Sequence, residues 1–121
     1  MKIRIKGNSI RFRLTRSEVE TLCDKGSIEE IVQFGEQELT YAVQRSQVEF
    51  MEASYKDNTI VLHISELKIQ GWEVNETVGF ESTVTTSSNT TLQLLLEKDF
   101  VCLDERLEDQ SDNYPNPKMF T

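Results

Sequence analysis

The stretch of sequence that decides the fold is residues 2–14, which read KIRIKGNSIRFRL. Apolar and charged side chains alternate here with a period of two, on both sides of the pair Gly7-Asn8. Glycine and asparagine tolerate the positive φ angles of a tight turn. The pattern therefore predicts a β-hairpin with strands at Lys2–Lys6 and Ser9–Leu14, one face of which is apolar and the other cationic.

A helix is predicted to follow this hairpin directly. Thr15-Arg16-Ser17-Glu18 has the order of a capping box, in which the threonine hydroxyl accepts from the third helical amide and the glutamate reaches back to the cap. The helix then begins at about Arg16, and Gly26 is placed to end it in a left-handed conformation. Its apolar face comprises Val19, Leu22 and Cys23.

Three more strand pairs are indicated further along the chain. They are Ile28–Phe34 with Glu38–Gln44, Gln47–Tyr55 with Thr59–Ile64, and Thr77–Thr85 with Thr91–Lys98. A short helical or irregular segment that includes Trp72, interpreted as a core residue, crosses between the last two pairs. The short turns predict antiparallel pairing, so the fold class is α+β: a mainly antiparallel sheet of about eight strands with one N-terminal helix. A sheet of this size either curls into a barrel or splits into two layers, and no internal repeat of fixed period is apparent.

The chain of 121 residues has the length of one domain. We expect a single globular domain at residues 1–103. From Asp104 onward the sequence is acidic and poor in apolar residues, and Tyr114-Pro115-Asn116-Pro117 cannot continue a helix or a central strand. Residues 104–121 are therefore predicted to form an irregular acidic tail that wraps the surface or stays mobile.

The formal net charge is -8, which opposes attraction to nucleic acid and to anionic lipid. We therefore expect neither as a partner. The start lacks the apolar run of a secretory signal, and no apolar run approaches the roughly 20 residues that cross a bilayer, so a cytoplasmic location is expected. Cys23 and Cys102 are isolated from each other and from His63, the only histidine, so no cofactor and no metal site is expected.

Five cations of the first hairpin define the candidate site. The alternation places them together on the face opposite its apolar residues, and they are Lys2, Arg4, Lys6, Arg11 and Arg13. We call this set the basic ribbon. Like charges on neighbouring strands repel, so the basic ribbon needs an anion beside it. That anion is either a phosphate- or carboxylate-bearing ligand held by the arginine forks, or acidic strands or the acidic tail of the same chain.

Other titratable residues allow further interpretations. One set of glutamates could gather on neighbouring strands and bind magnesium or calcium, although a solvated face is the simpler interpretation; it comprises Glu36, Glu38, Glu49, Glu52, Glu81 and Glu97. His63 lies within a predicted strand and is either a general base or a hydrogen-bonded structural residue. Cys102 is flanked by apolar residues, which favours a buried, inert thiol.

Both ends of the chain carry the resemblance to a family. Residues 1–11 (MKIRIKGNSIR) with Arg13-Leu14-Thr15, residues 96–103 (LEKDFVCL) and the late Asn116-Pro117 resemble a family of small bacterial proteins that is defined only as a domain of unknown function. The resemblance covers nearly the whole chain. It implies no activity, cofactor or catalytic residue.

These observations favour a non-enzymatic binding or interaction module, because no nucleophile, base and metal can be linked to one another. The alternative is a small enzyme or sensor that acts on an anionic ligand. In that case Arg4, Arg11 and Arg13 would hold the oxyanion, and Glu49 or Glu81 would serve as acid, base or metal ligand. The catalytic residues are otherwise unassigned. Exposed strand edges also make a homodimer or a protein partner an expectation.

Overall fold

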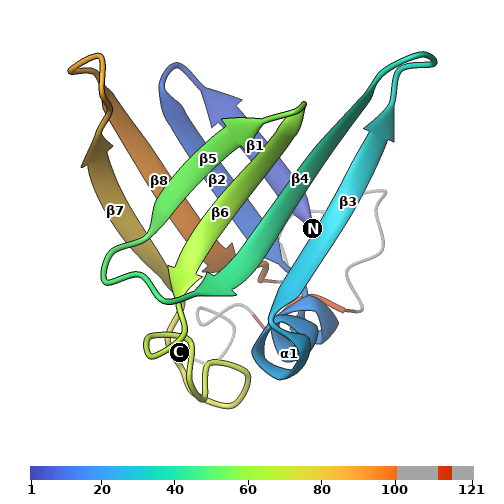
Figure 1. The fold of residues 1–121 in the computed structure, drawn as a ribbon. Helices are drawn as coiled ribbons and strands as arrows, with labels where there is room; N and C mark the ends of the chain where they lie inside the picture. Colours follow the sequence, from blue (N-terminus) through green and yellow to red (C-terminus); the bar gives the residue numbers. More distant parts are fainter. Residues whose placement is uncertain (101–111, 116–121) are drawn as a thin grey trace.

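The computed structural model describes residues 1–100 and 112–115 (Figure 1). These residues form eight strands and one helix: β1 (Lys2–Lys6), β2 (Ser9–Leu14), α1 (Arg16–Lys25), β3 (Ser27–Gln33), β4 (Glu38–Ser46), β5 (Glu52–Lys56), β6 (Thr59–Ser65), β7 (Gly79–Thr85) and β8 (Thr91–Lys98). Helix α1 lies at one end of the strands, and the hairpin turns point to the other end. The described residues include no helix that is long and apolar enough to span a membrane.

The strands are divided between two four-stranded sheets, in the orders β1-β2-β8-β7 and β3-β4-β6-β5. Each hairpin is antiparallel, as predicted, but the central pairs β2–β8 and β4–β6 are parallel. The prediction of antiparallel pairing is therefore wrong at the centre of each sheet. Turn lengths specify only hairpins, whereas these central pairs join strands that are distant in sequence. The sheets are mixed and neither is closed into a barrel.

The fold contains an internal repeat that the sequence analysis did not find. The register of β1 and β2 pairs Lys2 with Arg13, and that of β5 and β6 pairs Glu52 with His63, which are the same positions 50 residues later. The parallel pairs β2–β8 and β4–β6 also correspond, since Ser9 pairs with Gln93 in the first and the equivalent Thr59 pairs with Thr40 in the second. Each half therefore consists of a hairpin, a helical or turn-rich connection, and a second hairpin. The first hairpin of each half joins the second hairpin of the other half in one sheet.

The sequence signal of this repeat is confined to a few positions. Four residues of the first hairpin segment recur 50 residues later, namely Met1, Lys6, Asn8 and Ile10 as Met51, Lys56, Asn58 and Ile60. The burial of the two connections also corresponds, since Val19 and Leu22 of α1 match Ile69 and Trp72, and all four are at most 1% exposed. The two halves thus use equivalent positions to cover the same end of the core.

The hydrophobic core lies between the inner faces of the sheets. Its buried members are Phe12, Leu14, Val19, Leu22, Val43, Met51, Leu62, Ile64, Ile69, Trp72, Leu94, Leu96 and Tyr114. Trp72 is fully buried, so its interpretation as a core residue is confirmed. Its indole N–H donates to the Thr77 carbonyl at 2.8 Å, and its ring meets that of Phe80 edge-on at 5.1 Å. A buried indole needs such a hydrogen-bond acceptor.

Helix α1 has the predicted boundaries. The Thr15 side chain accepts from the Glu18 amide, and the Glu18 side chain accepts from the Thr15 amide, so the capping box is confirmed. Gly26 ends the helix with φ of 93°. Two predicted strands begin later than expected: β7 begins at Gly79 rather than Thr77, and β5 begins at Glu52 rather than Gln47. The residues before β5 carry the chain from β4 to the other edge of the same sheet.

Candidate functional site

The basic ribbon lies on the outer face of the sheet formed by β1, β2, β8 and β7. Arg4 stands opposite Arg11, and Lys2 stands opposite Arg13, across the first hairpin. On the opposite face of the same strands, Phe12 and Leu14 are fully buried. The period-two alternation therefore sorted the cations from the apolar residues, although Ile5, expected to face the core, is 58% exposed near the hairpin turn.

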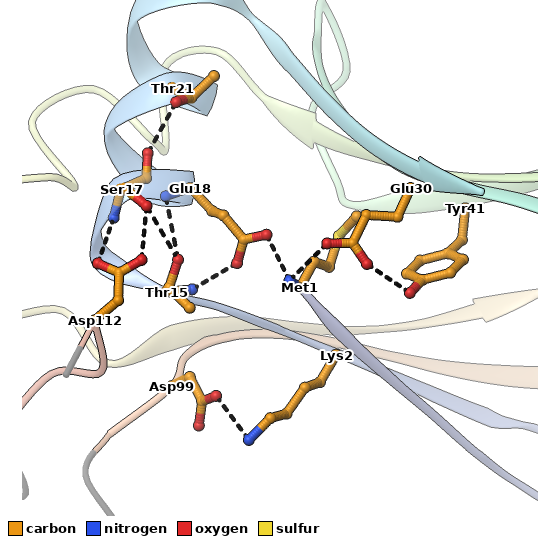
Figure 2. Close-up of polar contacts among 10 residues, drawn as sticks. All are labelled: Met1, Lys2, Thr15, Ser17, Glu18, Thr21, Glu30, Tyr41, Asp99 and Asp112. Atoms are coloured by element: carbon orange, nitrogen blue, oxygen red, sulfur yellow. Dashed lines mark hydrogen bonds and ion pairs between the residues drawn. The ribbon is translucent and has the colours of Figure 1, made fainter. Parts of the chain in front are cut away.

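Two members of the basic ribbon have carboxylate partners within the described part of the chain. The Lys2 ammonium lies 3.1 Å from Oδ2 of Asp99 (Figure 2), and Nε of Arg11 lies 2.9 Å from Oε1 of Glu97. Arg4, Lys6 and Arg13 form no ion pair with any described residue. Arg13 lies at the far end of the hairpin, opposite Lys2, whereas Arg4 and Lys6 lie toward its turn, on the exposed edge strand β1.

A shallow depression lies beside Arg4 and Lys6. It has a volume of about 610 Å³ and is lined by Arg4, Lys6, Gly7, Ser9, Arg11 and Gln93. The guanidinium groups supply planar pairs of N–H donors, the lysine supplies a point charge, and the serine and glutamine add neutral donors. This donor set suits an oxyanion such as a phosphate or carboxylate.

The six glutamates considered as metal ligands do not gather on one face. Glu81 and Glu97 lie on the outer face of the sheet that carries the basic ribbon, whereas Glu52 lies on the other sheet, opposite His63. Glu36 lies in the turn between β3 and β4. No group of three potential metal-ligating side chains occurs in the described ranges. The strand alternation did not reveal this separation, because it does not specify which sheet a strand joins.

Glu81 is the one carboxylate of the alternative enzyme hypothesis that lies near the basic ribbon. It lines a second depression together with Arg11, Ser9 and Gln93. Glu49 is in the connection between β4 and β5, on the other sheet. The structure therefore brings Glu81, but not Glu49, to the same depression as Arg11.

His63 is a hydrogen-bonded residue on the outer face of its sheet. Its Nδ1 lies 3.0 Å from the Ser46 hydroxyl, and its Nε2 lies 3.2 Å from the Ser54 hydroxyl. Both ring nitrogens thus have a partner within the fold, which is the arrangement of a structural histidine.

The acidic tail is described only at residues 112–115. Asp112 accepts hydrogen bonds from the Ser17 amide and hydroxyl at the start of α1 (Figure 2). These bonds to Ser17 are the main cause of a lowered Asp112 pKa. Tyr114 packs against Phe100 and is 9% exposed. These four residues contact α1 and the end of β8, not the basic ribbon. Residues 104–111, 116–121 and Cys102 lie outside the described residues.

A partly buried polar cluster surrounds the amino group of Met1, beside β1 (Figure 2). The Met1 amino group lies 2.5 Å from Glu18 Oε2 and 3.0 Å from Glu30 Oε1, and the Tyr41 hydroxyl donates to Glu30 at 2.7 Å. Burial and the hydrogen bond to Glu30 raise the pKa of Tyr41 to about 12. Burial opposes ionisation of Glu30, but its hydrogen bonds to Tyr41 and Met1 outweigh this and lower its pKa. Every group here has a partner, so the cluster is structural.

The sequence analysis did not single out Lys98, although it is 5% exposed. It lies at the end of β8, and the alternation that faces Leu94 and Leu96 inward also faces Lys98 inward. The sequence could have identified Lys98, because it occupies the next inward-facing position of β8 after Leu94 and Leu96, where an apolar residue is expected.

Fold and site together define an α+β protein of two mixed sheets with a cationic outer face. The chain belongs to a family of unknown function, DUF7009, whose model matches residues 1–118. The expected resemblance to such a family is therefore confirmed. Neither the comparison with curated proteins nor the comparison with solved structures found a match.

Proposed function

We propose that this protein is a binding module that takes an anionic group in the depression on the basic ribbon. Arg4, Lys6 and Arg11 would contact the oxyanion, and Ser9 and Gln93, which line the same depression, would donate hydrogen bonds to it. We propose binding rather than catalysis, because the described residues that line this depression include no nucleophile with a carboxylate or histidine base beside it.

One observation carries this proposal: the same hairpin folds twice, and only one copy is strongly cationic. The positions 50 residues after the five cations are Glu52, Ser54, Lys56, Val61 and His63. The second hairpin has the same register without four of the five charges. The fold therefore does not require the cations, although Arg4 and Arg11 stand opposite one another at a cost in stability. A ligand that needs them accounts for their presence.

The overall charge of the protein limits the size of the ligand. A net charge of -8 repels an extended polyanion, while a small anion is screened from distant charges over a Debye length of about 8 Å at physiological salt. The proposed ligand is thus a small phosphate- or carboxylate-bearing molecule, or one such group on a larger partner.

Isothermal titration of the full chain with inorganic phosphate, and separately with citrate, tests this function at constant ionic strength. The two anions distinguish a phosphate site from a carboxylate site. We expect saturable binding of at least one of them, weakened about tenfold by Arg4→Gln, which removes a charge-assisted hydrogen bond.

The internal repeat supplies a matched control. Lys6→Gln and Lys56→Gln remove one charge each from equivalent positions of the two hairpins. We expect Lys6→Gln to weaken binding severalfold and Lys56→Gln to leave it unchanged. Equal effects of the two variants would mean that only net charge matters, and the absence of saturable binding of either anion would refute the function.

A further inference from the structure

Lys98 occupies an unusual environment for a lysine. Its ammonium group donates to the Asn75 carbonyl at 2.7 Å and lies 4.9 Å and 5.7 Å from the ring centres of Tyr114 and Trp72. No carboxylate of the described residues forms an ion pair with it. An ammonium group has three donors, and a buried charge without a counter-ion is costly. Burial accordingly lowers the pKa of Lys98.

A donor without a partner lies beside this lysine. The hydroxyl of Tyr114 is buried and has no hydrogen-bond partner, and the residue as a whole is 9% exposed. Burial raises the pKa of Tyr114 to about 12, so the hydroxyl keeps its proton and remains a donor near neutral pH. Buried hydroxyls in folded proteins are normally hydrogen-bonded, and an exception calls for an explanation.

Both donors line one pocket at the end of the molecule that α1 covers. The pocket has a volume of about 710 Å³, within the range of roughly 300–1,000 Å³ that is usual for small-molecule sites. Its described lining combines apolar residues, among them Val74, Val78 and Phe100, with polar ones that include Arg16, Lys98 and Glu73. The Arg16 guanidinium lies 5.4 Å from the Tyr114 ring centre, so a second cation borders the site.

Two carboxylates also border this pocket, and neither forms an ion pair with Lys98. The Cys23 thiol is the main cause of a lowered Glu73 pKa, and the Glu73 charge favours the ionised form of Lys98. Glu76 is exposed to water. Two buried polar atoms at this pocket have no hydrogen-bond partner: the Tyr114 hydroxyl, which is a donor, and Oε2 of Glu73, which is an acceptor. The Lys98 ammonium has one partner, the Asn75 carbonyl, and two further protons to donate.

We propose that this pocket is a second binding site, separate from the basic ribbon, for a small carboxylic acid with an apolar body. The carboxylate would accept hydrogen bonds from Lys98 and from the Tyr114 hydroxyl, with Arg16 beside it. The apolar body would cover Val74, Val78 and Phe100. A monoanionic carboxylate matches these few donors better than a phosphate dianion does, because the phosphate needs more of them when it is buried.

Trp72 provides the assay, because it is the only tryptophan of the chain and its ring faces Lys98. We would titrate the full protein with benzoate, and with the uncharged isostere benzamide, and follow tryptophan fluorescence. The expected result is a saturable change with benzoate and at least tenfold weaker binding of benzamide. The proposal is overturned if benzoate gives no saturable change or if benzamide binds equally well.

Three single substitutions test whether benzoate binds in this pocket. Lys98→Met keeps the length of the side chain and removes its charge, and we expect it to bind benzoate at least tenfold more weakly. Tyr114→Phe removes only the unpartnered hydroxyl, and should weaken binding severalfold with an unchanged circular dichroism spectrum; it carries the test if Lys98→Met does not fold. Arg4→Gln, in the basic ribbon, should bind benzoate as the wild type does. Wild-type affinity of the Tyr114→Phe protein, or of folded Lys98→Met protein, would refute the site.

Discussion

Replacement of Gly79 by alanine is predicted to destabilise the protein by about 2 to 3 kcal/mol. Gly79 opens β7 opposite Glu97 of β8. A Cβ atom there would overlap the Leu96 carbonyl oxygen and lie 2.9 Å from the Glu97 Cα, and both are backbone atoms that cannot rotate away. Relief requires β7 to move off β8, which combines an overpacking cost of about 1 to 3 kcal/mol with a weakened ladder hydrogen bond of about 1 kcal/mol. The lower entropy of unfolded alanine offsets about 0.5 kcal/mol.

The assay is urea unfolding followed by the fluorescence of buried Trp72, with thermal unfolding as a second measurement. A loss of 2 to 3 kcal/mol corresponds to a midpoint lower by roughly 10 °C for a domain of this size. Ser27 is the matched control, because it opens β3 opposite Gln44 at the equivalent position of the repeat. Ser27→Ala should change stability by about 0.5 kcal/mol or less. A Gly79→Ala protein as stable as Ser27→Ala would refute the close approach of β7 to β8.

Three further predictions follow from named contacts. Glu97→Gln removes the charged partner of Arg11, a partly exposed ion pair, and should tighten phosphate binding about two- to fivefold, as measured by isothermal titration; unchanged or weaker binding would contradict the site. Thr15→Ala removes the helix cap and should cost about 1 kcal/mol in urea unfolding, whereas Thr21→Ala on the exposed helix surface should be nearly neutral. Because the folded pKa of Tyr41 is raised from 10.0 to about 12, its stabilisation is complete below pH 10 and lost as the pH rises through 12. Tyr41→Phe should therefore flatten the loss of stability over this window, and an unchanged slope would contradict its hydrogen bond to a carboxylate.

Local structure was predictable because its determinants are local. The alternation of residues 2–14 identified the first hairpin and sorted its cations from its core residues. The capping box at Thr15 and the left-handed Gly26 bounded helix α1. In each case the residues that specify the element lie within a few positions of one another.

The sheet order was not predictable in the same way. The contact of β2 with β8 joins residues such as Ser9 and Gln93, and no short-range signal specifies that pairing. The internal repeat was missed because the two halves share strand register and burial pattern but few identical residues. The basic ribbon could be listed from the sequence, but its division into paired and unpaired cations depends on Asp99 and Glu97, which only the tertiary fold brings close.

Only part of the second pocket could be predicted from the sequence. The inward orientation of the Lys98 side chain follows from the alternation of β8. Its contact with Tyr114 joins the main domain to a segment that the sequence pattern assigned to an acidic tail. A buried donor pair built from such distant residues is recognised only from the structure.

The most direct test of anion binding by the basic ribbon is a titration of isotopically labelled full-length protein with inorganic phosphate, in which the amide chemical shifts are followed by NMR. If the basic ribbon binds phosphate, saturable shifts are expected at the amides of the first hairpin, from Arg4 to Arg11, and at Gln93 of the adjacent strand β8. No comparable shifts are expected at the equivalent positions Ser54 to Val61 of the second hairpin. Equal shifts on both hairpins, or shifts confined to residues away from the basic ribbon, would contradict it.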